Sequence, residues 1–258
     1  MTRTMTDRVG LVTGGARGIG RAIAERLQRE GAHVVLLDCD PDPGEAAARE
    51  ISAGGDNAVH FLQVDLGATA GFEAVSDFIA GTYGHLDMLF NNTGIEIGKS
   101  FEKTTAADWD RVLGVNLRGA FLLAQVVLHL FPESGGSIVN ISSIHATHAF
   151  PESVAYACSK AGLIALTRNL ALELAKRRIR VNAICPGYID TRLWDEHLRH
   201  SANPEEVAAR TTALHPVGRR GVPADIAEAA LYLASDAASF VTGTHLVIDG
   251  GLTIRAHP

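Results

Sequence analysis

The 258-residue sequence has few cysteines and no excess of positive charge. Its three cysteines, Cys39, Cys158 and Cys185, are odd in number and widely spaced, which argues against a disulfide framework or a zinc site. Lysine and arginine together number 23 against 29 acidic residues, so the net charge of −6 provides no general attraction for nucleic acid or an anionic membrane. We therefore expect no nucleic-acid partner and no bound metal.

Long hydrophobic runs are also lacking. The longest, Phe121–Phe131, spans 11 residues and includes Gln125 and His129, whereas a membrane-spanning helix needs about 20 apolar residues. The N-terminal residues do not form the apolar stretch of a secretory signal. Together with the scarcity of cysteine, these features predict a cytoplasmic protein that does not associate with a membrane.

Glycine is abundant, with 26 residues, and short runs of Val, Ile and Leu alternate with longer amphipathic segments along the whole chain. That alternation is typical of βα units wound around a parallel sheet. We predict an α/β protein with a single-domain Rossmann fold, in which helices cover both faces of a doubly wound sheet. The seven predicted strands are Arg8–Thr13, His33–Asp38, Ala58–Asp65, Leu86–Asn91, Gly136–Ser142, Arg180–Cys185 and His245–Asp249. The predicted helices are Ile19–Glu30, Gly44–Ala53, Gly71–Tyr83, Ala106–Arg118 with an extension towards Phe131, Val154–Lys176 and Ala224–Ser235.

No linker or repeat divides the chain, so residues 1–258 are predicted to form one dinucleotide-binding and catalytic domain. Only the polar segment 188–221 departs from the βα rhythm. A long excursion of this kind is often functional, and we interpret it as a candidate substrate lid.

The first predicted strand leads directly into a glycine-rich turn and a helix. Gly14, Gly18 and Gly20 would allow the backbone to approach a pyrophosphate, whose charge the helix N-terminus stabilises. The second predicted strand ends in Asp38, and a carboxylate at this position binds the adenosine ribose hydroxyls and repels a 2′-phosphate. The sequence therefore favours NAD over NADP, although Arg17 in the turn is a possible phosphate ligand.

Tyr156 and Lys160 lie one turn apart on the same side of a predicted helix. A nearby ammonium group, together with an oxidised nicotinamide, favours the phenolate form of a tyrosine, so Tyr156 could accept a proton during alcohol oxidation. Ser143 follows the fifth predicted strand, at the edge of the sheet where ligands bind.

These motifs, in this order, resemble the single-domain short-chain dehydrogenase/reductases from Val9 to Gly251. The resemblance implies that Tyr156 is the general acid/base, that Ser143 holds the substrate oxygen, and that Lys160 binds the nicotinamide ribose. Asn116 would bend its helix and position a water that relays protons from Lys160. The implied catalytic residues are Asn116, Ser143, Tyr156 and Lys160, and the implied cofactor-binding residues are Gly14, Arg17, Gly18, Ile19, Gly20, Asp38, Asp65, Leu66, Asn92, Gly94, Tyr156, Lys160, Pro186, Gly187, Ile189 and Thr191. The resemblance also implies a homotetramer.

The substrate is predicted to be a sugar or polyol. The residues expected to line its pocket are Glu96, Ser143, His145, His148 and Trp194, which offer many hydrogen-bonding groups, and a site built for hydroxyl groups rejects analogues that lack them. The stretches around Glu96 and His145 resemble those of bacterial glucose 1-dehydrogenases of the family. Alternative functions are a dehydrogenase of hydroxysteroids or other lipid alcohols, a 3-oxoacyl carrier-protein reductase, and a non-catalytic dinucleotide-binding protein.

Overall fold

The computed structural model describes residues 4–68, 70–199, 201 and 203–255. Its centre is a seven-stranded sheet in the order β3-β2-β1-β4-β5-β6-β7, with every neighbouring pair parallel. The strands are β1 (Val9–Thr13), β2 (His33–Asp38), β3 (Val59–Gln63), β4 (Met88–Asn91), β5 (Gly136–Ile141), β6 (Ile179–Pro186) and β7 (His245–Ile248). The predicted α/β fold and its seven strands are confirmed. The prediction succeeds because most of these strands are buried on both sides and so read as continuous apolar runs.

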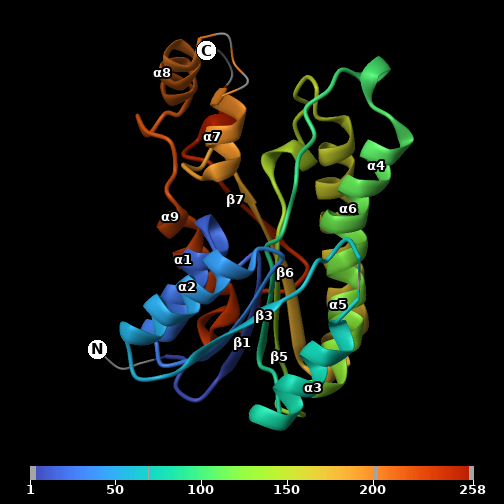
Figure 1. Ribbon diagram of the computed structural model, residues 1–258, viewed down its shortest axis with the longest axis vertical. Helices are drawn as coiled ribbons and strands as arrows, with labels where there is room; N and C mark the ends of the chain where they lie inside the picture. The colour runs from blue at the N-terminus through green and yellow to red at the C-terminus, as the bar shows by residue number, and fades with distance from the viewer. Residues whose placement is uncertain (1–3, 69, 200, 202, 256–258) are drawn as a thin grey trace.

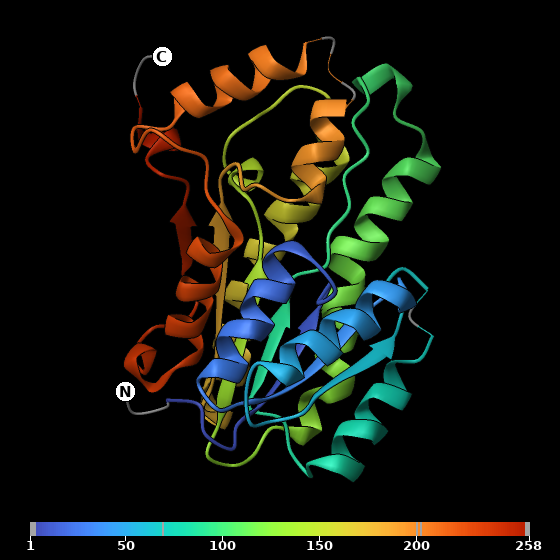
Figure 2. The ribbon, with the colours of Figure 1, turned by 60° about the vertical axis from the view of Figure 1, so that its left-hand side comes forward.

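Helices cover both faces of this sheet (Figure 1). One layer holds α1 (Gly18–Arg29), α2 (Pro41–Ala53) and α9 (Pro223–Ala234), and the other holds α3 (Phe72–Thr82), α4 (Ala106–Leu113), α5 (Gly119–Val127) and α6 (Val154–Leu174). Two large apolar cores result, besides a small cluster of Val112, Ala155 and Tyr156. One lies beneath α1 and α9, and the second lies beneath α3, α5 and α6. Helix α7 (Arg192–Arg199) and helix α8 (Pro204–Leu214) lie beyond the carboxyl ends of the strands (Figure 2).

Two of the predicted helices differ from the prediction by more than one or two residues at an end. Helix α2 starts at Pro41, three residues before the predicted Gly44. Proline is tolerated there because the first helical N–H groups need no partner within the helix. The helical segment from Ala106 to Leu130 is continuous but widens into a π-helical turn over Gly114–Arg118.

The segment Ala106–Leu130 is long and apolar enough to cross a membrane by length and composition alone. Its buried residues, however, pack within the protein. Leu123 and Val127 belong to the apolar core beneath α3, α5 and α6. Asn116, in the middle of the segment, is buried and hydrogen bonded. These contacts identify it as a core helix of the α/β fold.

The chain returns from β3 at one edge to β4 beside β1. In doubly wound sheets, ligands bind outside the carboxyl ends of the strands at such a reversal. The loops that follow β1, β4, β5 and β6 carry most of the site residues predicted from the sequence.

Candidate active site

The turn between β1 and α1 is shaped by close backbone packing. Gly14 and Gly18 have φ values of +63° and +56°, in the left-handed region that favours glycine. A β-carbon on Gly20 would collide with the carbonyl oxygen of Gly14 and with the side-chain amide of Asn92. That amide already donates to the carbonyl oxygens of Thr13 (2.9 Å) and Gly14 (3.2 Å). Asn92 therefore braces the turn from the neighbouring strand.

The residues present fit a dinucleotide. Helix α1 has no side-chain cap and no acidic residue in its first turn, so its free N–H groups and its dipole are available to a pyrophosphate. Asp38 ends β2 and accepts from the backbone N–H of Ala16 (3.2 Å), which fixes its carboxylate beside the turn. Ile19 is half-buried against the apolar core, so only its backbone is suited to a charged ligand.

An acidic residue that the sequence reading missed lies next to Asp38. Asp40 forms ion pairs with Arg17 (2.9 Å) and Arg192 (3.6 Å), which come from the glycine turn and from α7. The predicted phosphate ligand Arg17 is therefore engaged with a carboxylate. Asp40 stands only two residues beyond Asp38, and this proximity was the one sign of its position in the sequence. Its partner Arg192 is remote along the chain, so the ion pair could not be predicted.

The other predicted cofactor residues lie at the same edge of the sheet, but their side chains are not equally accessible to a ligand. Asp65 accepts from the N–H of Gly67 (2.8 Å) and pairs with Arg111 (3.4 Å). The side chains of Leu66 and Ile189 are buried in the apolar cores, which leaves only their backbone for a ligand. Pro186, Gly187 and Thr191 belong to the carboxyl end of β6 and the segment after it.

Four predicted catalytic side chains converge beyond β5. Tyr156 and Lys160 come from the first part of α6, and the Ser143 hydroxyl makes a hydrogen bond with the Tyr156 phenol. The ammonium of Lys160 lies 5.5 Å from the Tyr156 ring centroid and donates to the Ile141 carbonyl oxygen (2.8 Å). Gly94 faces it so closely that a β-carbon would lie 3.0 Å from Nζ of Lys160.

The π-helical turn places Asn116 against this group. Its Oδ1 accepts from the N–H of Ile95 (2.8 Å), and its Nδ2 donates to the Ile95 carbonyl oxygen (2.9 Å) and to Oγ of Ser159 (3.0 Å). The Ser159 hydroxyl in turn donates to the Tyr156 carbonyl oxygen (2.7 Å). A distorted helix turn around Asn116 is thus present, as the resemblance implied. The relay water remains a prediction.

The adjacent serines point in different directions. Ser142 donates to the carbonyl oxygen of Lys160 (2.8 Å), whereas Ser143 caps the short turn Ile144–Ala146 and accepts from the N–H of His145 (3.2 Å). Ser142 is therefore engaged with the backbone of α6, and the choice of Ser143 as the substrate ligand stays a prediction. Alternation along a strand predicts such opposite directions.

Burial dominates the titration of the central pair. It raises the pKa of the Tyr156 phenol, and the charge of Glu96 raises it further, while the hydrogen bond with Ser143 opposes both effects. Burial also lowers the pKa of Lys160 to about 8. The sequence argument expected the ammonium to lower the tyrosine pKa. In the chain alone burial and the charge of Glu96 dominate and the pKa of Tyr156 is raised instead, so phenolate formation depends on further positive charge.

The predicted substrate residues fall into two groups. The carboxylate of Glu96 accepts from the hydroxyl of the buried Ser153 (2.6 Å). The His145 ring lies edge-on to Tyr156, with 5.3 Å between ring centroids. Trp194 of α7 is buried and lies 5.4 Å from the Tyr188 ring. His148 is instead exposed on its loop and interacts with Thr147 (3.0 Å), and no described contact joins it to Tyr156.

Aromatic residues connect these groups, and the sequence reading did not assign them. Phe150 stacks on His145 with 4.0 Å between centroids and lies edge-on to Tyr188 at 6.4 Å. The contacts of Phe150 and Tyr188 join the segments that follow β5 and β6, so no local sequence pattern indicates them. The site therefore has an aromatic wall, with polar groups from Glu96 and His145. In the parts of the chain that the structure describes, no group of three or more His, Cys, Asp and Glu residues could hold a metal ion.

Comparison with known proteins gives concordant results. A family model described as enoyl-(acyl carrier protein) reductase matches residues 14–253. The chain is 39% identical to 2-(S)-hydroxypropyl-CoM dehydrogenase 3 of Xanthobacter autotrophicus, over 98% of this chain and 99% of that protein. It is 40% identical to the NAD-dependent glycerol dehydrogenase of Listeria innocua, over 97% and 96%.

A solved structure shares the fold as well. The aldohexose dehydrogenase of Thermoplasma acidophilum superposes with a TM-score of 0.90 at 35% identity, covering 100% of this chain and 98% of that one. Other matching proteins include an NADP-dependent (R)-specific alcohol dehydrogenase of Lentilactobacillus kefiri and a 3beta-hydroxysteroid dehydrogenase of Eggerthella lenta. The relatives therefore include NAD-dependent and NADP-dependent enzymes, and their names refer to several classes of alcohol.

Proposed function

The chain belongs to the short-chain dehydrogenase/reductase family, and from that premise we propose that it transfers a hydride reversibly between NAD and a secondary hydroxyl of a sugar or polyol. The observation that carries the proposal is the convergence of Ser143, Tyr156 and Lys160 at the sheet edge that also holds the glycine turn. Loss of the tyrosine or the lysine would mark a non-catalytic dinucleotide-binding protein, and both are present.

The proposed chemistry divides between the chain and its cofactor. A bound nicotinamide would supply the hydride acceptor and, in its oxidised form, a positive charge. Ser143 holds the substrate oxygen, and Tyr156 takes the hydroxyl proton as the carbonyl forms, or returns it in the reverse direction. Lys160 binds the nicotinamide ribose, and its ammonium favours the phenolate. Asn116 fixes the backbone at Ile95 and Tyr156, so it keeps the reacting groups in register.

NAD is the proposed cofactor. The carboxylates of Asp38 and Asp40 lie together at the end of β2, and a 2′-phosphate placed there would meet two negative charges. Arg17 and Arg192 partly compensate that charge through Asp40. The NAD-dependent glycerol dehydrogenase among the relatives supports this preference, and the NADP-dependent relative argues for testing it.

A polyhydroxylated substrate is favoured by the polar groups beside the tyrosine. Glu96 and His145 present hydrogen-bonding groups, while the rings of Phe150, Tyr188 and Trp194 provide flat apolar surfaces for a sugar ring. Glycerol and aldohexose dehydrogenases among the matches support this class. The segment 188–221 carries α7 and α8 over the site, and we propose that it acts as a lid. Residues 200 and 202 of this segment lie outside the described residues.

A substrate screen tests the proposal. Purified protein is assayed with aldoses, polyols, hydroxysteroids and acyl ketones, each with NAD(H) and with NADP(H). We expect the highest kcat/KM for a sugar or polyol with NAD. A preference for a hydroxysteroid or an acyl ketone would show that the substrate belongs to that class instead. No turnover with any pair of substrate and cofactor would reject the enzymatic function.

Variants of the pocket then test how that substrate is held. Glu96→Ala and His145→Ala are expected to raise KM for the polyol several-fold, because each removes a hydrogen-bonding partner of a hydroxyl group. His129→Ala provides the matched control, since this exposed histidine lies on the helix end near the opposite sheet edge. Unchanged kinetics in both pocket variants would show that Glu96 and His145 do not contact the substrate.

A further inference from the structure

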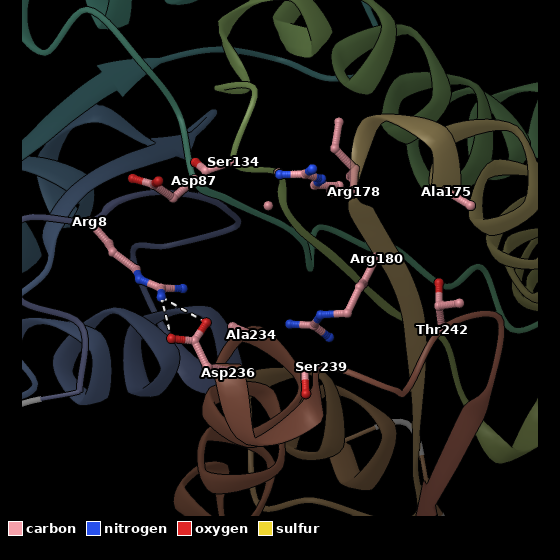
Figure 3. A pocket seen from close by; sticks show the side chains of 13 residues that line it. Arg8, Asp87, Ser134, Ala175, Arg178, Arg180, Ala234, Asp236, Ser239 and Thr242 are labelled. Carbon is pink, nitrogen blue, oxygen red and sulfur yellow. Dashed lines mark hydrogen bonds and ion pairs between the residues drawn. The ribbon is translucent and has the colours of Figure 1, made fainter.

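A cavity of about 630 Å³ lies at the amino edge of the sheet, opposite the candidate active site. Its walls include Arg8 before β1, Asp87 before β4, and Arg180 near the start of β6. Arg178 comes from the turn that precedes β6. Figure 3 shows the guanidinium groups of Arg8, Arg178 and Arg180 directed towards a common space.

Two of these arginines are held in place by the protein. Nη2 of Arg8 donates to both carboxylate oxygens of Asp236 (2.8 Å each). Arg180 donates to the carbonyl oxygens of Leu233 (2.6 Å) and Ser235 (3.1 Å), at the end of α9. These carbonyl groups bear only partial charge, and no carboxylate of the described residues is hydrogen bonded to Arg180. Its burial lowers the pKa of the guanidinium.

The third arginine has unused hydrogen-bonding capacity. Among the described residues, Arg178 makes neither a hydrogen bond nor an ion pair through its side chain, and Nε and Nη1 of Arg8 donate no hydrogen bond. The hydroxyls of Ser134 and Ser239, which also line the cavity, have no hydrogen-bond partner in the described part of the chain. Asp87 adds a negative charge, but its carboxylate already accepts from the N–H of Val9 (2.7 Å).

The charged side chains around the cavity therefore carry a net positive charge. Three guanidinium groups face two carboxylates, and each carboxylate is already engaged by groups of the protein. Unused donors that converge from separate elements on one concave space are the features that bind phosphate or carboxylate groups. The volume lies within the range of small-molecule sites.

We propose that this cavity binds a small anion with two or more negative charges, carried by phosphate or carboxylate groups. Arg178 supplies the free cation, and Arg8 supplies its two unused donors. The bound anion would connect the start of β1 to the turn before β6. It would lie apart from the dinucleotide, because the two sites occupy opposite ends of the strands.

Isothermal titration calorimetry with pyrophosphate and with citrate tests the proposal. The glycine turn is itself a candidate pyrophosphate site, so titrations are made with and without saturating NADH. We expect binding that persists with NADH and weakens as the salt concentration rises. Arg178→Ala should raise the Kd about tenfold or more, since a hydrogen bond to a charged group is lost, and Arg178→Lys should raise it less. The probe that binds more tightly identifies the preferred anionic group.

Arg49→Ala is the matched control, because it removes the same charge from an exposed position on α2. Its Kd should stay within twofold of the wild-type value. Tyr156→Phe should also leave anion binding unchanged, which separates this proposal from the hydride-transfer function. An unaltered Kd in Arg178→Ala, displacement of the probe by NADH, or no measurable binding of either probe would overturn the proposal.

Discussion

The residues that carry the proposed chemistry are held in place by a few close contacts with neighbouring side chains and backbone groups. Gly20 and Asn92 hold the glycine turn, and Asn116 holds the backbone around Tyr156. Sequence motifs identified all of these positions. Pairings between remote segments, such as Arg192 with Asp40, were not visible, because nothing in the sequence indicates that α7 returns to the end of β2.

Asp38 allows a residue-scale test of cofactor choice. Asp38→Ala should narrow the ratio of kcat/KM for NAD over NADP by roughly tenfold or more, because a charge that repels the 2′-phosphate and binds the ribose is removed. Steady-state kinetics with both cofactors measure this ratio. Asp42→Ala, at an exposed position on α2, is the control and should leave the ratio unchanged. An unchanged ratio in Asp38→Ala would show that another group discriminates between the cofactors.

At the scale of elements, the sequence predicted the seven strands well and the helix ends less well. Strands such as His33–Asp38 are apolar, flanked by turn residues and buried on both sides, so pattern and structure coincide. The start of α2 was missed because Pro41 and Pro43 look like loop residues. The π-helical turn at Gly114–Arg118 has no periodic signature of its own, since it depends on the tertiary contacts of Asn116.

Helix α1 provides an element-scale prediction about pH. Glu30, which follows its last turn, accepts from Arg26 (2.6 Å) and from the Thr4 hydroxyl (2.9 Å), and these partners lower its pKa to about 2 from an ordinary value of 4.5. A lowered carboxyl pKa contributes stability above about pH 4.5 that is lost as the pH falls towards 2. Glu30→Gln should therefore reduce the free energy of unfolding by about 1 kcal/mol at pH 6.

Urea unfolding at several pH values measures this effect. The difference between wild type and Glu30→Gln should shrink as the pH falls from 4.5 towards 2, because the carboxyl of the unfolded wild-type chain takes up a proton in this range while the folded one stays ionised. Glu45→Gln, in an exposed ion pair on α2, is the comparison variant and should show little change at either pH. A difference for Glu30→Gln that is independent of pH would contradict the assigned ion pair.

At the scale of the whole molecule, the two edges of the sheet have different charge and different proposed ligands. The carboxyl edge holds the glycine turn and the catalytic group, and the amino edge holds the arginine-lined cavity. The sequence predicted the first edge because its residues form contiguous motifs. It could not predict the second, because Arg8 and Arg180 are far apart in the chain and only the parallel sheet aligns the starts of their strands.

We propose that the chain forms a homotetramer, whose interfaces would cover exposed apolar residues. Phe121 of α5 and Leu172 of α6 are exposed on one face, while Tyr232 of α9, Phe240 and Val247 of β7 are exposed towards the other end of the sheet. Light scattering after size exclusion should give four times the chain mass of 27.3 kDa, or about 109 kDa. Leu172→Arg should reduce this mass, since a buried unpaired charge opposes association. A monomeric wild-type protein would contradict the proposed assembly.

The proposed function depends most directly on Tyr156 as the group that exchanges a proton with the substrate. Tyr156→Phe removes only the phenolic hydroxyl, and Tyr83→Phe is the matched control, because the half-buried Tyr83 at the end of α3 also has a buried hydroxyl. With the best substrate from the screen, kcat of Tyr156→Phe should fall at least about 100-fold while the Kd for NADH changes little. Tyr83→Phe should keep full activity. Near-normal turnover in Tyr156→Phe would contradict the account.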